Sequence, residues 1–306
     1  SFVTLAGEYV YKWKKPVNFG FLDFSTLEKR EKFCHQELVL NKRLCPDVYL
    51  DVVSLNGSGD TMVLDGDGEV IEYGVKMKRM DQNGLMNKRI ADGTLKDADI
   101  DGIVTVLVPF YENAAGDETI QKYGTAKGFG VNVIENFDQT EGFIGGGALD
   151  QQTFDDIKKY SLTFLENVSL FQRRIDDGRV RDCHGDLYSA NICFDKENTF
   201  IFDCIEFNNR FRYSDVAADI GFLAMDLDFH GLETLSDYFV DKYIEQSGDQ
   251  DIRDVLGFYK CYRAYVRAKI GLFTVSDPAV DKIVAEKYLK DTIRYFQLAR
   301  RYASAG

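Results

Sequence analysis

Apolar and polar positions in the first quarter of the chain repeat with the period of β-strands. Short alternating runs over residues 1–24 predict a strand pair, and β-branched and aromatic residues predict further strands at 48–55 and 69–80. Gly-Asp clusters in the intervening "NGSGDTMVLDGDG" predict hairpin turns. A helical period appears only at residues 25–46, where Ser25 and Glu28 form a capping box. This part is therefore predicted to be a small β-rich lobe with one helix.

After residue 80 the pattern becomes mainly helical. The periodicity predicts a helix at residues 99–114 and another at 153–178 with Thr153 as its N-cap, and it predicts helices again over residues 215–306. Residues 114–150 are glycine-rich and weakly periodic, so we expect a functional or mobile loop there. The pattern as a whole predicts an α+β chain with two lobes, 1–80 and 81–306.

Composition narrows the class of protein. Of the 306 residues, 45% are hydrophobic and 13% aromatic, which indicates a folded chain. No apolar run approaches the roughly 20 residues that span a bilayer. The net charge of −13 repels nucleic acid and anionic membranes, so we expect neither as a partner. The oligomeric state is left open.

Six scattered cysteines without a secretory signal favour reduced thiols and a cytoplasmic location. The first ten residues, "SFVTLAGEYV", lack the basic start and cleavage site of a signal peptide. The sequence begins at Ser1 and not at methionine, which allows for residues that precede it.

The segment "RVRDCHGDLYSANICFDKENTFIFDCIEF", residues 179–207, concentrates chemically active side chains. A Cys/His metal site or a cysteine nucleophile is not favoured, because Cys183 and His184 are adjacent and adjacent strand side chains point to opposite faces. The spacing to Cys193 and Cys204 also matches no zinc module. We therefore interpret these cysteines as core residues.

The oxygen-bearing side chains of this segment are more informative. A β-hairpin over "NICF" and "FIFD" brings Asn191 close to Asp203, with Asp186 facing both. An amide oxygen and a carboxylate can hold Mg²⁺, and a further carboxylate can accept the proton of an attacking hydroxyl. These are requirements of phosphoryl transfer from ATP, which also needs a lysine on the phosphates and a glutamate that holds it. Lys12 and Glu37 can supply both, although Lys14 lies on the same strand face and competes with Lys12.

"HGDLYSAN" followed by "FIFDCIEF" resembles the catalytic motif of the aminoglycoside phosphotransferase and choline kinase family, relatives of the protein kinases. "QELVLNKRL" and "SDVAADIGFLA" resemble further elements of that family, and the resemblance covers nearly the whole chain. It is strongest to an uncharacterised bacterial branch, some members of which are fused to a P-loop ATPase domain. This resemblance implies a protein kinase-like fold.

It also implies roles for individual residues. Asp186 would be the catalytic base, Asn191 and Asp203 the Mg²⁺ ligands, and Lys12, paired with Glu37, the contact to the ATP phosphates. His184 and Asp219 would be structural. The backbone of the hinge would bind adenine, at Lys76, Met77 and Lys78.

Two features depart from the family pattern. No glycine-rich loop precedes Lys12, and Asp203 is followed by Cys-Ile where protein kinases have Phe-Gly. Each residue also has an ordinary alternative, since the lysines can protect a strand edge and Asp203 can cap a strand. Their joint occurrence in the expected order favours the functional interpretation.

The acceptor is not identified by the sequence. Glu206, Asp226 and Asp228, near several aromatic residues, would suit a cationic acceptor, or they line an ordinary helix end. The leading hypothesis is an ATP- and Mg²⁺-dependent kinase of a small hydroxylated molecule, aminoglycoside-like or a metabolite. The alternatives are a kinase or nucleotidyl transferase acting on a protein, and a nucleotide-binding pseudokinase that regulates a partner.

Overall fold

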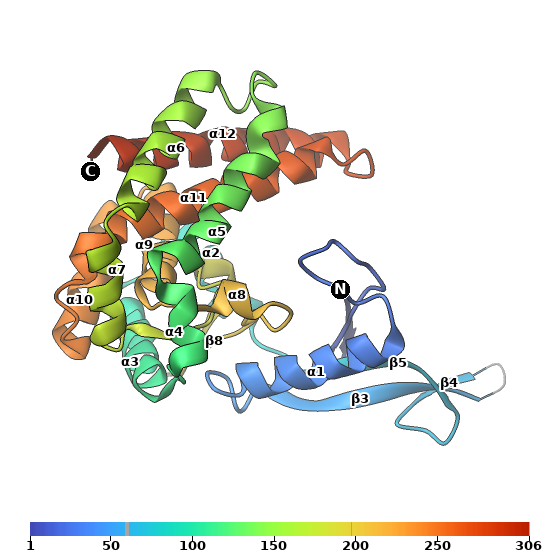
Figure 1. Ribbon diagram of the computed structural model, residues 1–306. Coiled ribbons are helices and arrows are strands. Elements are labelled where there is room, and N and C mark those ends of the chain that lie inside the picture. Colours follow the sequence, from blue (N-terminus) through green and yellow to red (C-terminus); the bar gives the residue numbers. More distant parts are fainter. Residues whose placement is uncertain (59–60, 197, 306) are drawn as a thin grey trace. The chain divides into compact units, whose positions relative to one another are not determined.

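The computed structural model describes residues 1–58, 61–196 and 198–305 (Figure 1). The chain has an α+β fold in which an antiparallel sheet comes first and a mainly helical part follows, as predicted. Two compact units are present: residues 1–106 with 184–212, and residues 107–183 with 213–306. The boundary predicted near residue 80 stays a prediction, and the turn predicted at residues 59–60 lies outside the described residues.

The first unit is built on a five-stranded antiparallel sheet with the strand order β1-β2-β5-β3-β4. Its strands are β1 (Phe2–Ala6), β2 (Tyr9–Trp13), β3 (Tyr49–Ser58), β4 (Thr61–Leu64) and β5 (Glu69–Lys78). Helix α1 (Leu27–Asn41) packs against β5 and β3. The sequence-predicted strands and helix of this region are thus confirmed.

The start of α1 differs from the prediction by one residue. Thr26, not Ser25, is the N-cap, and its hydroxyl accepts a hydrogen bond from the backbone N–H of Lys29 at 3.3 Å. The hydroxyl of Ser25 instead donates to the carboxylate of Asp23 at 2.6 Å. Both hydroxyl residues are adequate caps, and the competing carboxylate two residues earlier decided between them.

The rest of the first unit surrounds a short hairpin. Its strands β7 (Ile192–Asp195) and β8 (Asn198–Ile201) pair antiparallel, as predicted. The remaining elements of this unit are η1 (Gln82–Gly84), α2 (Met86–Ala91), η3 (Ser189–Asn191) and α8 (Asn209–Arg212). Helix α3 (Asp97–Asn113) runs from the first unit into the second.

The second unit is mainly helical. Its longest helices, α11 (Ile252–Ser276) and α12 (Lys282–Ala305), pack side by side and are drawn in orange and red in Figure 1. The strands β6 (Val180–Asp182) and β9 (Tyr213–Asp215) pair antiparallel. The other elements are α4 (Glu118–Gly124), α5 (Ala126–Thr140), η2 (Glu141–Phe143), α6 (Gln151–Leu165), α7 (Val168–Asp176), α9 (Ala217–Phe229) and α10 (Glu233–Ser247).

The loop expected at residues 114–150 is wrong, because most of this segment is helical in α4 and α5. Phe129, Val133 and Phe137 repeat every four residues and are buried, so a helical period was present in the sequence. Gly124 is a packing residue, since an added Cβ would come within 2.3 Å of the Val180 side chain. Gly124, one of the glycines that suggested a loop, therefore allows α4 to pack closely against β6.

The helix predicted at residues 153–178 is interrupted. Helix α6 ends at Leu165 and α7 begins at Val168, so two helices replace the single predicted one. The N-cap is Asp150, whose carboxylate accepts from the backbone N–H of Thr153 at 2.8 Å. Thr153 was predicted as the cap, but it lies inside the first turn and donates its hydroxyl to the same carboxylate.

All six cysteine side chains are buried and none forms a disulfide, which confirms Cys183, Cys193 and Cys204 as core residues. Burial raises the pKa of Cys193 to about 11, so this thiol stays protonated near neutral pH. Among the described residues, no helix is both long and apolar enough to cross a membrane.

A buried ion cluster holds part of the second unit together. Arg174 of α7 donates to both oxygens of Asp215 at 2.8 Å and also pairs with Asp249. All three side chains are at most 2% exposed. One arginine thus compensates two buried carboxylates, which would be costly to leave unpaired.

We expect Arg174→Met to lower the free energy of unfolding by roughly 3–5 kcal/mol, because it removes the arginine partner of buried Asp215 and leaves Asp249 with only Arg179, 3.7 Å away. The matched control is Arg173→Met on the same helix, since the Arg173 side chain is 45% exposed in its pairs with Asp251 and Asp254. The control should change stability by about 1 kcal/mol or less. Urea unfolding measures both, and equal losses would contradict the assignment.

Candidate active site

Lys12 of β2 and Lys14, just after the end of that strand, share one glutamate of α1. Lys12 and Lys14 are two residues apart, so both side chains project from the same face of the strand. The Lys12 Nζ lies 3.0 Å from Glu37 Oε1, and the Lys14 Nζ lies 2.6 Å from Glu37 Oε2. Lys12 also contacts the Asp203 carboxylate at 2.5 Å, and Lys14 pairs with Glu206. Five alternating charges thus form one row from Asp203 to Glu206.

In this row, burial and the neighbouring charges act in opposite directions on the pKa values of Lys12, Asp203 and Glu206. Burial by itself would lower the pKa of Lys12, but Glu37 and Asp203 raise it well above its ordinary value. Burial would raise the pKa of Asp203, and the Lys12 ammonium outweighs it and lowers that pKa. Burial raises the pKa of Glu206, with Lys14 opposing the rise. The pKa values of the two carboxylates at the ends of the row are therefore shifted in opposite directions, down for Asp203 and up for Glu206.

The backbone around Asp203 is held in an unusual conformation. Asp203 has a φ of 62°, in the left-handed region that few residues other than glycine, asparagine and aspartate adopt. Its N–H donates to the Tyr49 hydroxyl at 3.2 Å, and the next N–H, of Cys204, donates to the Asn41 amide oxygen at 2.9 Å. Asn41 lies one turn after Glu37 on α1. The same helix therefore anchors both the lysines and the Asp203 backbone.

The loop of residues 184–191 is fixed from within. The His184 Nδ1 accepts from the Asp186 N–H at 3.2 Å, so its Nε2 carries the proton and donates to the Phe202 carbonyl at 3.0 Å. Gly185 has a φ of +87°, and an added Cβ would meet the Phe211 carbonyl oxygen at 2.8 Å. Through these contacts His184 joins the Asp186 backbone to the segment that leads to Asp203, and its structural role stays a prediction.

The predicted metal ligands are neighbours through the β7–β8 hairpin. The Phe202 N–H donates to the Asn191 carbonyl at 2.9 Å, which places Asn191 beside the residue that precedes Asp203. The Asn191 side-chain amide donates to a carboxylate oxygen of Asp186 at 3.0 Å. Within the described ranges, no group of three or more His, Cys, Asp or Glu side chains is arranged to hold a metal. A cation here would depend on the amide oxygen together with Asp203.

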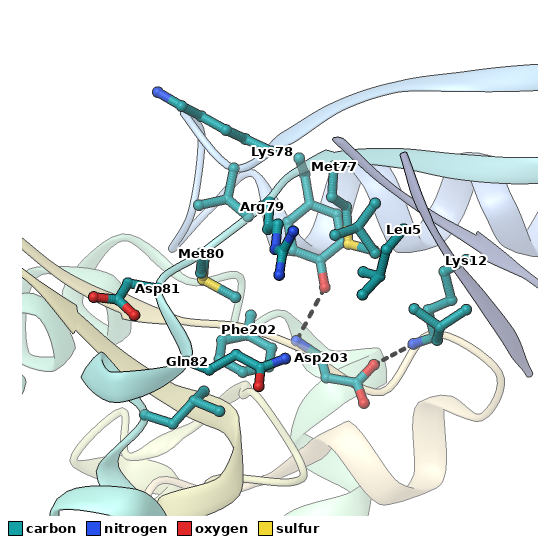
Figure 2. A pocket seen from close by; sticks show the side chains of 15 residues that line it. Leu5, Lys12, Met77, Lys78, Arg79, Met80, Asp81, Gln82, Phe202 and Asp203 are labelled. Carbon is teal, nitrogen blue, oxygen red and sulfur yellow. Dashed lines mark hydrogen bonds and ion pairs between the residues drawn. The ribbon is translucent and has the colours of Figure 1, made fainter. Parts of the chain in front are cut away.

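A cavity of about 320 Å³ opens beside Lys12 and Asp203 (Figure 2). Leu5 of β1 and Met77 of β5 lie on one side of it, and Phe202 and Gln82 lie on the other. The volume is at the lower end of those found for small-molecule sites, and the lining is mostly apolar with a few charged groups. Such a slot can take a flat ring with a charged tail directed at Lys12.

The predicted hinge residues lie only partly at this cavity. Met77 and Lys78 line it, together with the following residues 79–82. The Lys76 ammonium instead lies over the Tyr9 ring, 4.3 Å from its centre. The N–H groups of Lys78 and Arg79 donate at 2.8 Å to the carbonyls of Val48 and Glu8, so these two donors are already used within the sheet.

The carboxylates predicted to bind an acceptor are buried and compensated. Glu206 is 6% exposed and pairs with Lys14. Asp228 is 8% exposed, pairs with Lys260 at 2.5 Å and accepts from the Tyr302 hydroxyl. Asp226 is 2% exposed, with His230 at 3.8 Å. These three carboxylates therefore belong to the interiors of their units.

Asp219, predicted as structural, is fully buried in α9. Its carboxylate accepts from the Tyr111 hydroxyl at 3.2 Å and lies 3.6 Å from the Arg263 guanidinium. Both contacts belong to the interior of the second unit.

Sequence reasoning missed two residues that support this site. Asn41 had a usable signal, because it is a polar residue one helical turn after Glu37 on the face that also carries Cys34. Tyr49 had none, since its contact with Asp203 joins residues that are 154 positions apart. Lys14 was considered only as a competitor of Lys12, whereas both lysines contact Glu37.

Three solved structures that share this fold are named as two kinases and a phosphotransferase. A choline kinase from Cryptosporidium parvum is 9% identical with a TM-score of 0.55, covering 97% of this chain and 82% of its own. The GDP complex of aminoglycoside 2'-phosphotransferase-IIIa is 14% identical with a TM-score of 0.52, covering 98% and 89%. An ethanolamine kinase from Plasmodium vivax is 11% identical with a TM-score of 0.52, covering 95% and 74%. The chain therefore has the fold of the aminoglycoside phosphotransferases and choline kinases.

The names of the sequence relatives state no activity. Uncharacterised proteins of Mycobacterium tuberculosis and Mycobacterium bovis are 33% identical over 276 residues, which is 88% of this chain. The match covers 52% of each of them, so the chain spans about half the length of the curated relatives it matches. No protein-family model matches the chain. The P-loop ATPase fusion implied by the resemblance stays a prediction.

The Lys12–Asp203 pair predicts a pH-dependent contribution to stability. Because the pKa of Asp203 is lowered in the folded chain, the pair stabilises above the unfolded value near 4 and is lost as pH falls through the folded pKa. Asp203→Asn removes the charge and keeps a residue that tolerates φ 62°. We expect wild type to exceed this variant in unfolding free energy at pH 7, with the difference shrinking below pH 4. A difference independent of pH in urea unfolding would contradict this assignment.

Proposed function

We propose that this chain is a phosphotransferase that uses ATP and Mg²⁺ to phosphorylate a hydroxyl of a small molecule, aminoglycoside-like or a metabolite. One observation carries the proposal: the Lys12 ammonium lies between Glu37 and Asp203 at the wall of a mostly apolar cavity. A lysine held by a glutamate beside a metal-binding aspartate is the arrangement that phosphoryl transfer from a nucleotide requires.

The cavity suits the nucleotide. Its apolar walls, with Leu5 and Met77 opposite Phe202, suit a purine ring (Figure 2). We place the polar edge of the ring at residues 79–82, because the Lys78 and Arg79 N–H groups are used within the sheet. The phosphates would then lie toward Lys12, whose raised pKa keeps it protonated.

Asn191 and Asp203 would hold Mg²⁺. Both offer oxygen atoms, which this ion prefers, and the Asp203 side chain is 44% exposed. The rest of the coordination would come from water and the nucleotide phosphates, as is usual for Mg²⁺ sites. When bound, the ion would neutralise the charge on the transferred phosphoryl group.

Asp186 would act as the base that accepts the proton of the attacking hydroxyl. Its side chain is partly exposed, and the Asn191 amide donates to one of its carboxylate oxygens. That hydrogen bond orients the carboxylate that would accept the proton. His184 holds the Asp186 backbone, so its role is to place the base and not to exchange protons.

A small hydroxylated acceptor is favoured by the neighbours of this fold. They are an aminoglycoside phosphotransferase, a choline kinase and an ethanolamine kinase. We propose no cation-binding role for Glu206, Asp226 or Asp228, because all three are buried, and Glu206 and Asp228 are paired with lysines of their own unit.

Binding of nucleotide should be visible without knowledge of the acceptor. ATP with Mg²⁺ should raise the thermal unfolding temperature, because a ligand that binds only the folded chain stabilises it by mass action. At a ligand concentration of 100 times the dissociation constant this stabilisation is about 2.7 kcal/mol. Asp203→Asn should abolish the part of this shift that requires Mg²⁺. Adding sugars, amino alcohols and aminoglycosides to the same assay screens for the acceptor. A wild-type chain that shows no shift with any nucleotide would refute the proposed function.

Loss of the base should separate binding from chemistry. Asp186→Asn should lower kcat by about 10²–10⁴-fold and leave the affinity for ATP within about threefold, because the base acts on the acceptor and not on the nucleotide. Asp195→Asn, at an exposed position of the β7–β8 hairpin, is the matched control and should keep full activity. Turnover of ATP with the acceptor from the thermal screen measures both. Unchanged turnover in Asp186→Asn would remove Asp186 from the mechanism.

A further inference from the structure

Lys14 is a second lysine at the candidate site with no part in the mechanism above. Its side chain is 1% exposed, and its ammonium contacts only carboxylates and the Phe24 ring among its described partners. It does not line the cavity beside Lys12. A buried lysine is costly unless it is paired on all sides, so its presence calls for an explanation.

The two lysines hold Glu37 in different ways. The Lys14 Nζ donates a hydrogen bond to Glu37 Oε2 at 2.6 Å. The Lys12 Nζ lies 3.0 Å from Oε1, but this buried oxygen accepts no hydrogen bond in the described structure. The hydrogen bond of Lys12 is directed at Asp203 (Figure 2). Glu37 is therefore fixed by Lys14, while Lys12 is attracted by Glu37 and oriented toward the cavity.

Glu206 completes the arrangement on the far side. Its carboxylate accepts from Lys14, so Lys14 is held between Glu206 and Glu37. Glu206 lies three residues after Asp203 in the same segment. The segment that carries the proposed metal ligand thus also carries the carboxylate that fixes Lys14.

We propose that Lys14 and Glu206 form a positioning pair that holds the Glu37 carboxylate, so that Lys12 stays directed at Asp203 and the cavity. This inference rests on the proposed function, because it assigns the phosphate contact to Lys12 alone. Without Lys14, Glu37 would keep a single cation, and Lys12 would turn from Asp203 toward it.

An acyl phosphate of ATP tests this division of roles. Such a probe transfers its acyl group to a lysine amine near the bound phosphates, forming an amide as the acyl–phosphate bond breaks and ATP leaves. In wild type, mass spectrometry should find the acyl group on Lys12 and not on Lys14. Lys15→Met, at an exposed neighbour on the same segment, should label as wild type does.

Variants test whether Lys14 acts through Glu37. Lys14→Met should lower ATP affinity and the rate of Lys12 acylation by about 10- to 100-fold, as for residues that orient a ligand-contacting group. Glu206→Gln should lower both by about threefold, since its amide oxygen still accepts from Lys14. The double variant should lose no more than Lys14→Met, because the two residues act as one unit. Calorimetry with ATP and Mg²⁺ gives the affinities.

Each outcome decides the matter. Acylation of Lys14, wild-type affinity and labelling in Lys14→Met, or additive losses in the double variant would overturn the inference and leave the proposed function standing. If Lys14→Met does not fold, the labelled position in wild type and the response of Glu206→Gln still decide. If wild type binds no nucleotide, the proposed function fails and this inference fails with it.

Discussion

The buried carboxylate of Glu37 is the constraint on which the candidate site depends. It is fully buried, and a carboxylate in that position is tolerated only with cations beside it. Lys12 near the end of β2 and Lys14 just after it supply these cations, and each also pairs with a further carboxylate. The sheet, α1 and the segment 203–206 are thus joined by alternating charges, and removing one member leaves the next without a partner.

Hydrogen bonds to the backbone also help to hold the candidate site in place. Tyr49 and Asn41 accept from the N–H groups of Asp203 and Cys204, and His184 bridges the Asp186 and Phe202 backbones. These contacts hold Asp203 in a left-handed conformation that would otherwise be unfavourable. A strained backbone that several partners stabilise at one point is typical of functional sites, and it agrees with the proposed role of Asp203.

The second unit also buries carboxylates beside basic side chains, and we propose no catalytic role for these pairs. Arg174 compensates Asp215 and Asp249, Lys260 compensates Asp228, and Arg263 lies beside Asp219. Asp228, which the sequence suggested for a cationic acceptor, is therefore paired with a lysine inside this unit. Charged residues near a functional motif are informative about ligands only when the fold leaves them accessible.

The sequence alone determined the elements with strong local signals. Alternation predicted the strands, the helical period and a capping box predicted α1, and the runs "NICF" and "FIFD" predicted the β7–β8 hairpin, because each signal depends on residues near in the chain. It failed at residues 114–150, where Gly124, which allows α4 to pack closely against β6, resembles a loop glycine, and at Thr153, where a carboxylate three residues earlier made a better cap.

Only the tertiary structure decided how Lys12 and Lys14 divide their partners, that Tyr49 supports Asp203, and that Glu206 and Asp228 are buried. Lys12 and Lys14 lie on the same strand face, so the local pattern treats them alike. Their partners Asp203 and Glu206 lie about 190 residues away in the chain. Contacts of that separation leave no local periodicity, and the fold alone assigns each lysine its carboxylates.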